Sequence, residues 1–284
     1  MATKIHPTAV IEDGAELGQD VEIGPHTVIG PAVRIGDRTR IGPLVRIDGH
    51  TVLGEDNHIL GQASLGGAPQ DFSYHDEPTR LEMGDRNTIR EFVTINRGTV
   101  KGGGVTRLGS DCLLMACSHV AHDCELADKV ILGNNVMLAG HVLVGERANI
   151  SGAAAAHHFV TVGPLAYVGA MTRMVHDVPP YMILEGHRPR VRGVNHIGLQ
   201  RAGYSKDVVH ELKSAHHELW RSNEPRNQVL ERLAAESAAG SMVAELVEFL
   251  MRTEIGGKGR YRESLREEFI REGEERILGG SSVR

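Results

Sequence analysis

The chain has 284 residues, of which 40 % are hydrophobic, 4 % are aromatic and 24 % are charged, and its formal net charge at pH 7 is −6. This length allows one large or two modest domains, and the negative charge argues against a general nucleic-acid binder. Residues 1–30 lack the pattern of a signal peptide, no stretch reaches the ~18 apolar residues of a membrane span, and three cysteines make no disulfide framework in a chain this long, so we expect a cytoplasmic protein.

Aliphatic residues recur every six positions along most of the chain. The column covers residues 5–65, resumes over 83–95 and, after one slip, continues over 108–174. A glycine often follows the column residue, as at Gly24 and Gly36. A fixed short repeat is typical of a solenoid, and a period of six predicts a parallel β-helix. A β-sandwich would instead show alternation with a period of two and unevenly spaced turns.

Each six-residue unit is expected to form one short strand and one turn, so that three units make a triangular coil. The aliphatic side chain points into the prism, and we expect the glycine to supply a turn conformation that residues with a Cβ resist. Each coil adds a layer of about 4.8 Å, the spacing of hydrogen-bonded strands. The period does not determine the hand of the helix, because parallel crossovers are normally right-handed.

Two insertions interrupt the repeat, at about 66–81 and 97–106. Loops that break a regular stack are usually functional or disordered. The second insertion contains three consecutive glycines, 102–104, but it lacks the Lys-Ser/Thr ending and the strand-to-helix context of a P-loop. We therefore expect a flexible surface loop there. The predicted β-helical domain, insertions included, covers residues 1–194.

Five of the 16 histidines lie within one part of the repeat: His119, His122, His141, His157 and His158. Because residues 18 apart stack on successive coils, His122, Gly140 and His158 are expected to share one column, with roughly 10 Å between the two imidazoles. An imidazole titrates near neutral pH and is the usual general base. A single histidine would be an ordinary surface residue, whereas this cluster predicts a site.

The pattern becomes helical after about residue 195, and residues 195–284 are predicted to form a C-terminal helical domain. Ser205 can cap a helix with apolar residues at helical spacing, and two further helices are expected before Gly256. A last helix is expected at about 261–278, where few apolar residues lie among mixed charges. We interpret it as a solvated surface helix rather than a partner-binding one.

Over residues 1 to about 262 the sequence resembles the bacterial UDP-N-acetylglucosamine O-acyltransferases, the first enzymes of lipid A biosynthesis. The matching motifs are Gln70-Asp71, Glu77-Pro78-Thr79-Arg80, Gly84-Asp85-Arg86-Asn87, Ile89-Arg90-Glu91, Val93-Thr94-Ile95-Asn96-Arg97-Gly98-Thr99, Gly102-Gly103-Gly104, His119-Val120-Ala121-His122-Asp123-Cys124, Leu138-Ala139-Gly140-His141-Val142, Asp177-Val178-Pro179-Pro180-Tyr181 and Gly193-Val194-Asn195. Their order and the two insertions match as well. The resemblance implies a left-handed β-helix with an active site between the subunits of a homotrimer.

The resemblance implies transfer of a 3-hydroxyacyl chain from acyl carrier protein to the sugar 3-hydroxyl of a UDP-sugar. His122 would be the general base, Asp123 would orient it, and the backbone N–H of Gly140 would bind the oxyanion. No cofactor and no metal is expected, since the carrier thiolate is already a competent leaving group. The substrate contacts that the resemblance implies are Asp71 and His141 for the sugar, Gln70, His119 and His157 for the cleft, and Asn195 and Arg201 for the nucleotide.

Four positions depart from the family pattern. They are Ser73 in place of a lysine, His158 in place of a glutamine in the cleft, Ile197 in place of a nucleotide-contacting glutamate and Ala202 in place of a second arginine. The catalytic histidine is retained, so acyl transfer is expected. The acceptor stays open between UDP-N-acetylglucosamine, its 3-amino analogue and another nucleotide sugar.

Two further features concern the acyl donor. A basic patch made of Arg188, Arg190 and Arg192, with Arg173 upstream, is expected to dock the acidic carrier protein. Ala170 occupies the position at which the family stops the acyl chain. Because alanine is small, we expect a preference for chains longer than ten carbons.

A zinc enzyme of the gamma-type carbonic anhydrase class is the alternative reaction, since those proteins are also trimeric left-handed β-helices. His119, His122 and His141 could supply imidazole ligands, and the three cysteines could add thiolates. That class lacks the first insertion and the helical tail. A scaffold without activity is a third alternative, and the intact His122-Asp123 pair argues against it.

Overall fold

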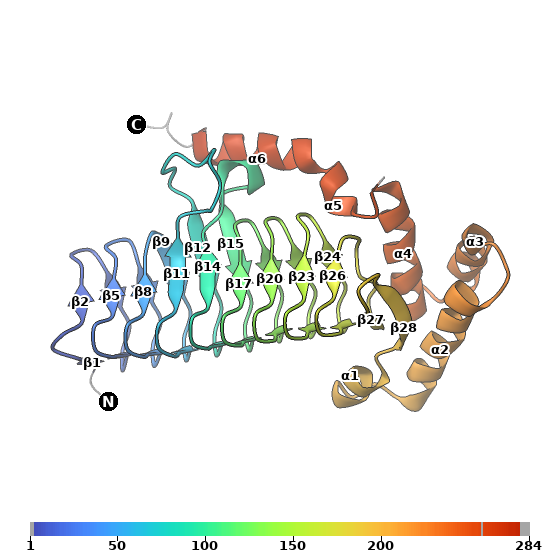
Figure 1. Cartoon of the computed structure of the whole chain (residues 1–284), viewed down its shortest axis with the longest axis horizontal. Coiled ribbons are helices and arrows are strands. Elements are labelled where there is room, and N and C mark those ends of the chain that lie inside the picture. Colours follow the sequence, from blue (N-terminus) through green and yellow to red (C-terminus); the bar gives the residue numbers. More distant parts are fainter. Residues whose placement is uncertain (1–2, 257, 279–284) are drawn as a thin grey trace.

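The structure, a computed structural model, describes residues 3–256 and 258–278. Short parallel strands form three sheets, which are the three faces of a long prism (Figure 1). The first sheet contains β1 (Lys4–Ile5), β4 (Glu22–Ile23), β7 (Arg40–Ile41), β10 (His58–Ile59), β13 (Thr88–Ile89), β16 (Leu113–Leu114), β19 (Ile131–Leu132), β22 (Asn149–Ile150), β25 (Tyr167–Val168), β27 (Met182–Glu185) and β28 (Arg190–Val194). The second contains β2 (Val10–Ile11), β5 (Val28–Ile29), β8 (Arg46–Ile47), β11 (Ser64–Gly67), β14 (Thr94–Asn96), β17 (His119–Val120), β20 (Met137–Leu138), β23 (Ala155–Ala156) and β26 (Arg173–Met174). The third contains β3 (Glu16–Leu17), β6 (Arg34–Ile35), β9 (His50–Leu53), β12 (Arg80–Met83), β15 (Val105–Leu108), β18 (Glu125–Leu126), β21 (Leu143–Val144) and β24 (Thr161–Val162).

Successive coils pair in register, 18 residues apart wherever the repeat is regular. Ile5 lies beside Ile23 in this way. Across the first insertion Ile59 lies beside Ile89, and across the second Ile89 lies beside Leu114, so both insertions leave the stack as loops. The column of buried aliphatic side chains therefore runs through the prism without a break, and the parallel β-helix predicted from the period of six is confirmed.

The glycines that follow column residues serve close packing between coils. A Cβ on Gly24 would lie 2.7 Å from the carbonyl carbon of Gly42, and one on Gly36 would lie 2.5 Å from that of Gly54. Neither Gly24 nor Gly36 has a positive φ; a later turn residue has it instead, as Leu44 does with φ at 58°. The expectation that these glycines supply the turn conformation is therefore wrong, and the close approach of the next coil is what excludes a side chain.

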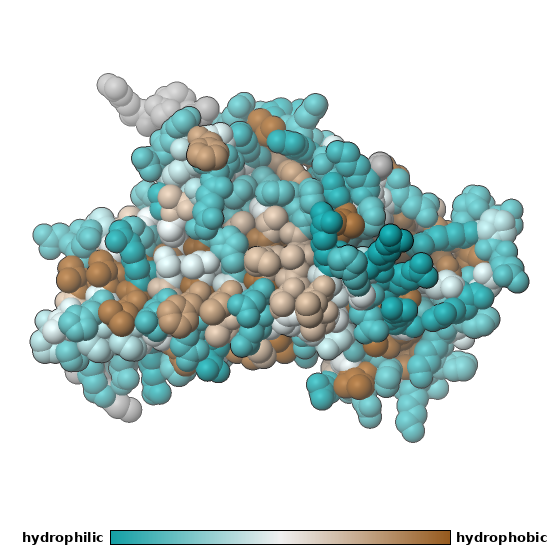
Figure 2. Space-filling model, viewed as in Figure 1, coloured by the Kyte–Doolittle hydropathy of each residue, from teal (hydrophilic) through white to brown (hydrophobic). Residues whose placement is uncertain are grey.

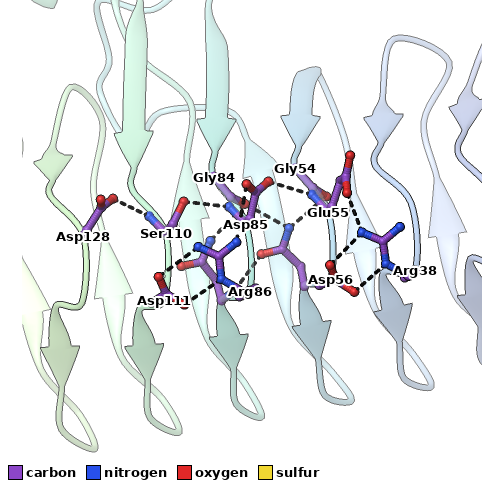
Figure 3. A network of polar contacts seen from close by, with 12 residues as sticks. Arg38, Gly54, Glu55, Asp56, Gly84, Asp85, Arg86, Ser110, Asp111 and Asp128 are labelled. Carbon is purple, nitrogen blue, oxygen red and sulfur yellow. Dashed lines mark hydrogen bonds and ion pairs between the residues drawn. The ribbon is translucent and has the colours of Figure 1, made fainter.

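Buried asparagines on successive coils lie at one corner of the prism. Figure 3 shows the polar contacts around Gly54 and Gly84 at this corner. The Asn57 amide donates to the carbonyl oxygens of Gly54 and Gly84, and its oxygen accepts from the backbone N–H of Asn87. One coil later the oxygen of Asn87 accepts from the backbone N–H of Cys112 at 2.9 Å. Each asparagine thus replaces backbone hydrogen bonds that the turn itself cannot make.

The helices follow the last coil. They are α1 (His196–Arg201), α2 (Lys206–Arg221), α3 (Arg226–Glu236), α4 (Met242–Ile255), α5 (Tyr261–Ser264) and α6 (Arg266–Leu278). Ser205 caps α2, as predicted, because its Oγ accepts from the backbone N–H of Val208. Leu212, Leu230 and Leu246 pack into a second core that includes β27 and β28, the antiparallel hairpin at the end of the prism. Within the described ranges no helix is both long enough and apolar enough to cross a membrane.

Helices α5 and α6 turn back and run along the prism toward the two insertions (Figure 1). Helix α6 packs on η1 (Val100–Gly102), a 3-10 helix in the second insertion. A Cβ on Gly273 would overlap the carbonyl oxygen of Val100, so glycine permits this close approach. Two expectations differ from the structure here: the helix at 261–278 has a packed face, and the glycine triplet belongs to a short ordered turn.

Asn87→Ala is expected to lower the free energy of unfolding by about 1–3 kcal/mol, because the buried N–H of Cys112 loses its acceptor. Denaturant unfolding at matched protein concentration measures the loss. Asp111→Ala is the matched control, since it breaks the ion pair with Arg86 on the exposed side of the same corner (Figure 3). Exposed pairs contribute little to stability, so equal losses in the two variants would contradict the role given to Asn87.

Candidate active site

A cavity of about 400 Å³ lies where three successive turns of the prism meet the first insertion and α6. Six residues predicted from the sequence line it: Gln70, Asp71, His122, His141, His157 and His158. The histidines come from the turns after β17, β20 and β23, which are consecutive strands of one sheet. Stacking of coils therefore brings together side chains that are far apart in the sequence.

His122 and Asp123 form a hydrogen-bonded pair at the wall of this cavity. His122 Nδ1 lies 2.7 Å from Asp123 Oδ2. The buried Asp123 carboxylate also accepts from the backbone N–H of Thr99 at 2.7 Å and from Thr99 Oγ1 at 2.6 Å. The carboxylate is thereby fixed in place and holds the His122 proton on Nδ1, so that Nε2 is the nitrogen free to accept a proton.

Gly140 lies one coil beyond His122 and in contact with its ring. A Cβ on Gly140 would overlap the imidazole, so only glycine fits. The backbone N–H of Gly140 donates no hydrogen bond to any residue in the described parts of the chain. A backbone N–H beside the base that has no other acceptor is available to donate a hydrogen bond to an oxyanion.

A row of stacked rings runs outward from His122. The ring of His141 meets it edge-on with centroids 5.3 Å apart, and Phe159 stacks on His141 at 4.3 Å. Burial lowers the pKa of His141 to about 4, although the Asp123 carboxylate opposes the shift. Burial also lowers the pKa of His158. The neutral His141 ring can donate or accept a hydrogen bond toward a sugar without adding charge.

A lysine joins the first insertion at the cavity wall. Asp71 Oδ1 accepts from the backbone N–H of Ser73 at 2.9 Å and from Ser73 Oγ at 2.8 Å, and these bonds hold the pKa of Asp71 below its ordinary value. Lys101 Nζ donates to Ser73 Oγ at 2.6 Å. A cation from the second insertion thus reaches Ser73, the position at which the resembled family often has its own lysine.

Lys101, Phe159 and Arg266 line the cavity but were not predicted from the sequence. The only available signal was for Lys101, a basic residue inside a glycine-rich insertion. Phe159 is one residue after His158 and looks like an ordinary core residue. Nothing in the sequence connects Arg266, in α6, with the histidines of the prism.

Other predicted residues lie away from this cavity. His119 is hydrogen-bonded through Nδ1 to Thr94 Oγ1 at 2.7 Å, outside the lining. Asn195 and Arg201 line a separate cavity of about 660 Å³ on the face of the first sheet. Asn195 also caps α1, since its Oδ1 accepts from the backbone N–H of Gly198 at 3.1 Å. A single chain therefore does not bring these two residues to His122.

The residues assigned to the acyl donor are also separate from the histidines. Arg190 and Arg192 line a third cavity, of about 670 Å³, together with two further arginines, Arg221 and Arg226. The lining of this cavity does not include Arg188 or Arg173, which are exposed, or Ala170, which is exposed in the turn after β25.

Three side chains have ligand atoms within 4.8 Å of one another: His122, Asp123 and His141. Both Asp123 oxygens are already hydrogen-bonded, and His119, which the zinc alternative requires, is not in this group. Burial raises the pKa of the Cys112 thiol to about 11 and that of the Cys124 thiol to about 12, so neither offers a thiolate near pH 7. The geometry therefore favours base catalysis over metal binding.

Known proteins of one kind are similar to this chain in sequence and structure. A family model described as UDP N-acetylglucosamine O-acyltransferase, domain 2, matches residues 177–258. The acyl-[acyl-carrier-protein]–UDP-N-acetylglucosamine O-acyltransferase of Burkholderia lata is 46 % identical over 258 residues, covering 89 % of this chain and 98 % of its own. The enzyme of the same name from Anaeromyxobacter is 47 % identical over 252 residues, with the same coverage.

Solved structures agree with the sequence comparison. A UDP-N-acetylglucosamine acyltransferase from Bacteroides fragilis superposes with a TM-score of 0.84 at 35 % identity, covering 87 % of this chain and 96 % of that one. The enzyme from Campylobacter jejuni gives a TM-score of 0.83 at 36 % identity and the same coverage. The predicted fold class, a left-handed parallel β-helix followed by a small α-helical domain, is confirmed.

His141→Asn is expected to change how stability depends on pH. The native pKa of about 4 lies below the ordinary value of 6.5, so between them the unfolded chain binds a proton that the native state does not. The parent's free energy of unfolding therefore falls as the pH falls through this interval, by about 3 kcal/mol for this group. Denaturant unfolding at steps from pH 7 to pH 4 should show that loss in the parent relative to the variant.

The exposed His58 on β10, changed to asparagine, controls for the substitution itself. Parallel stability curves for the parent and the His141 variant would contradict the low pKa of this ring.

Proposed function

The chain belongs to the UDP-N-acetylglucosamine O-acyltransferase family, and we propose that His122 is the base of that reaction. The enzyme moves a 3-hydroxyacyl chain from acyl carrier protein to the 3-position of UDP-N-acetylglucosamine, in the first step of lipid A biosynthesis. The observation that carries the assignment is the His122–Asp123 pair at a cavity, with the unused N–H of Gly140 beside it.

The reaction needs one group that accepts a proton and one that donates a hydrogen bond to the oxyanion. His122 Nε2 takes the proton of the sugar 3-hydroxyl as that oxygen bonds to the thioester carbonyl carbon. The carbonyl oxygen becomes an oxyanion that accepts a hydrogen bond from the Gly140 N–H, and one such donor is typically worth ~10²–10³ in rate. The carbonyl double bond then re-forms, the C–S bond breaks, and the carrier sulfur leaves as a thiol after taking the proton from His122 Nε2. Asp123 stabilises the imidazolium in between.

The remaining cavity residues are proposed to bind the acceptor. Asp71 and His141 hold the sugar, and Gln70, His157 and His158 lie in the same lining. The acyl group arrives as a thioester and is already activated, so the proposed mechanism uses no cofactor. The cytoplasm is the proposed location, because acyl carrier protein and nucleotide sugars are both found there.

We further propose a homotrimer with the active site between neighbouring subunits. Asn195 and Arg201, assigned to the nucleotide, lie in a different cavity from His122 within one chain. Two copies would bring the two sets together if the first-sheet face of one packed against the histidine turns of the next. Exposed apolar side chains on the prism, such as Met137 and Met171, support such contact. Figure 2 shows pale-brown patches along the prism and mostly teal over the C-terminal helices.

The carrier protein is proposed to dock on the arginines near the end of the prism: Arg173, Arg188, Arg190 and Arg192. Arg190 and Arg192 lie with two more arginines around one cavity, which gives an acidic partner several cations at once. Ala170 is proposed to leave room for acyl chains longer than ten carbons, since its exposed side chain is a single methyl group.

His122→Ala is expected to lower kcat by at least about 10², the lower end for loss of a general base, while the circular dichroism spectrum stays that of the parent. The assay follows transfer from a ladder of 3-hydroxyacyl carrier proteins to UDP-N-acetylglucosamine and, separately, to its 3-amino analogue. His58→Ala, far along the prism, is the matched control. Activity within a few-fold of the parent would remove His122 from the role of base.

Mixing two inactive variants tests whether neighbours share the site. His122→Ala and Arg201→Ala chains, each weak alone, are unfolded and refolded together in equal amounts. In a ring of randomly mixed subunits about one site in four pairs an intact His122 with an intact Arg201 from the next chain, so about a quarter of the parent activity should return. A mixture no more active than the average of its two components would place the whole site within one chain.

A further inference from the structure

The C-terminal segment from Lys258 to the end of α6 is anchored to the prism at its first turn. Asp177 Oδ2 accepts from the backbone N–H of Tyr261 at 2.9 Å. The buried Arg260 donates through Nη1 to the carbonyl oxygen of Val175 at 2.6 Å. These contacts tie α5 to the last coils of the prism, next to the helical domain.

A second set of contacts holds the segment nearer the cavity. Arg262 Nη2 donates to Glu125 Oε1 at 2.8 Å, on β18. Farther along, α6 lies on η1, with Gly273 against the carbonyl oxygen of Val100 and Ile277 against Gly104. Because the segment is held at both ends, the residues between the two anchors have a defined position over the cavity.

These contacts place Arg266 in the lining of the catalytic cavity. Its guanidinium carbon lies 6.0 Å from the centroid of the Phe159 ring, and Phe159 stacks on His141, which meets His122 edge-on. Lys101, on the 3-10 helix that α6 covers, lines the same cavity. One cation therefore comes from the C-terminal segment, and the other comes from a turn that this segment packs against.

Neither cation forms an ion pair with a carboxylate among the described residues. The two carboxylates in the lining have other direct partners: Asp71 accepts from Ser73, and Glu263 pairs with Arg260 and Lys258. The hydrogen bonds from Ser73 and, to a smaller extent, the charge of Lys101 lower the pKa of Asp71. Lys101 donates a hydrogen bond to the neutral Ser73 hydroxyl. The cavity thus presents two cations that no carboxylate of the described residues contacts directly, which is the electrostatic setting for an anion.

We propose that Arg266 and Lys101 form a clamp for a substrate phosphate group at the catalytic cavity. This inference rests on the proposed acyl transfer, in which both substrates carry phosphate: the diphosphate of the UDP-sugar, and the phosphodiester of the arm that carries the acyl chain. The flat guanidinium can bind two phosphate oxygens at once, and the lysine ammonium adds a point charge. Arg266 is thereby a substrate-binding residue supplied by a segment beyond the region of family resemblance.

The test compares two arginines of α6, one inside the cavity lining and one outside it. Arg266→Ala is expected to raise KM for one substrate by about ten-fold or more, the effect of losing one charge-assisted hydrogen bond, with kcat within about three-fold of the parent. Arg271→Ala removes the same charge from the same helix but outside the cavity lining, and it should leave both KM values unchanged. Arg266→Lys should recover part of the loss.

The identity of the affected substrate distinguishes the phosphate sources. A rise in KM for UDP-N-acetylglucosamine alone assigns the clamp to the diphosphate, and a rise for the acyl carrier substrate alone assigns it to the arm. Lys101→Met should raise the same KM as Arg266→Ala. If neither KM changes by more than about two-fold in Arg266→Ala, or if Arg271→Ala has an equal effect, the clamp does not exist.

Two further measurements separate this inference from the proposed reaction. Calorimetric titration with UDP-N-acetylglucosamine, and with the phosphopantetheine arm alone, reports phosphate binding without turnover. Weakened binding in Arg266→Ala would support the clamp even if the parent transferred no acyl chain, and unchanged binding of both ligands would overturn it. Gly273→Leu replaces no residue of the cavity lining but forces α6, and Arg266 with it, away from Val100, so it should weaken binding of the same ligand.

Discussion

The stacking of each coil on the next, by parallel hydrogen bonds between residues 18 apart, is the constraint on which the rest of the molecule depends. It turns distance along the chain into height along the prism, so that His122, Gly140 and His158 come from successive coils of one column. It also makes any side chain at the coil contact costly, and this is why glycine recurs after the column residue. The position of the catalytic base and the composition of the repeat thus have a common origin.

The segments that interrupt this regular stack build the chemistry that the stack cannot supply. A regular turn offers a histidine little support, whereas the second insertion places Thr99 against both oxygens of Asp123. Gly102 lies so close to this carboxyl group that a Cβ there would overlap it. The first insertion brings Asp71 over the same cavity. The prism therefore sets where the pair lies, and the insertions set its hydrogen bonding and its charge.

The repeat and the histidine cluster could be predicted from sequence because both are periodic, and a period converts directly into spatial neighbours. The role of the glycines was assigned wrongly, because sequence spacing cannot distinguish a strained turn from a close contact between coils. Lys101 and Arg266 were missed for a different reason. The C-terminal segment reaches Glu125 and the cavity across more than a hundred residues, without any repeat, so only the folded chain shows that α6 lies at the cavity. Arg201 differs in the opposite way. The family resemblance predicted it as a substrate-binding residue, but within one chain it lies in a different cavity from the histidines.

Solenoid proteins commonly change length in evolution by gaining or losing whole coils, because each coil contacts only its neighbours. The C-terminal segment removes this freedom here. Its first anchor is the hydrogen bond to Asp177, and its far end packs on η1. The segment therefore spans about four coils, each contributing about 4.8 Å. One added coil between these anchors would carry Arg262 away from Glu125 and shift α6 off the second insertion. Because the segment has a fixed length between its two anchors, it constrains the number of coils between the catalytic turn and the helical domain.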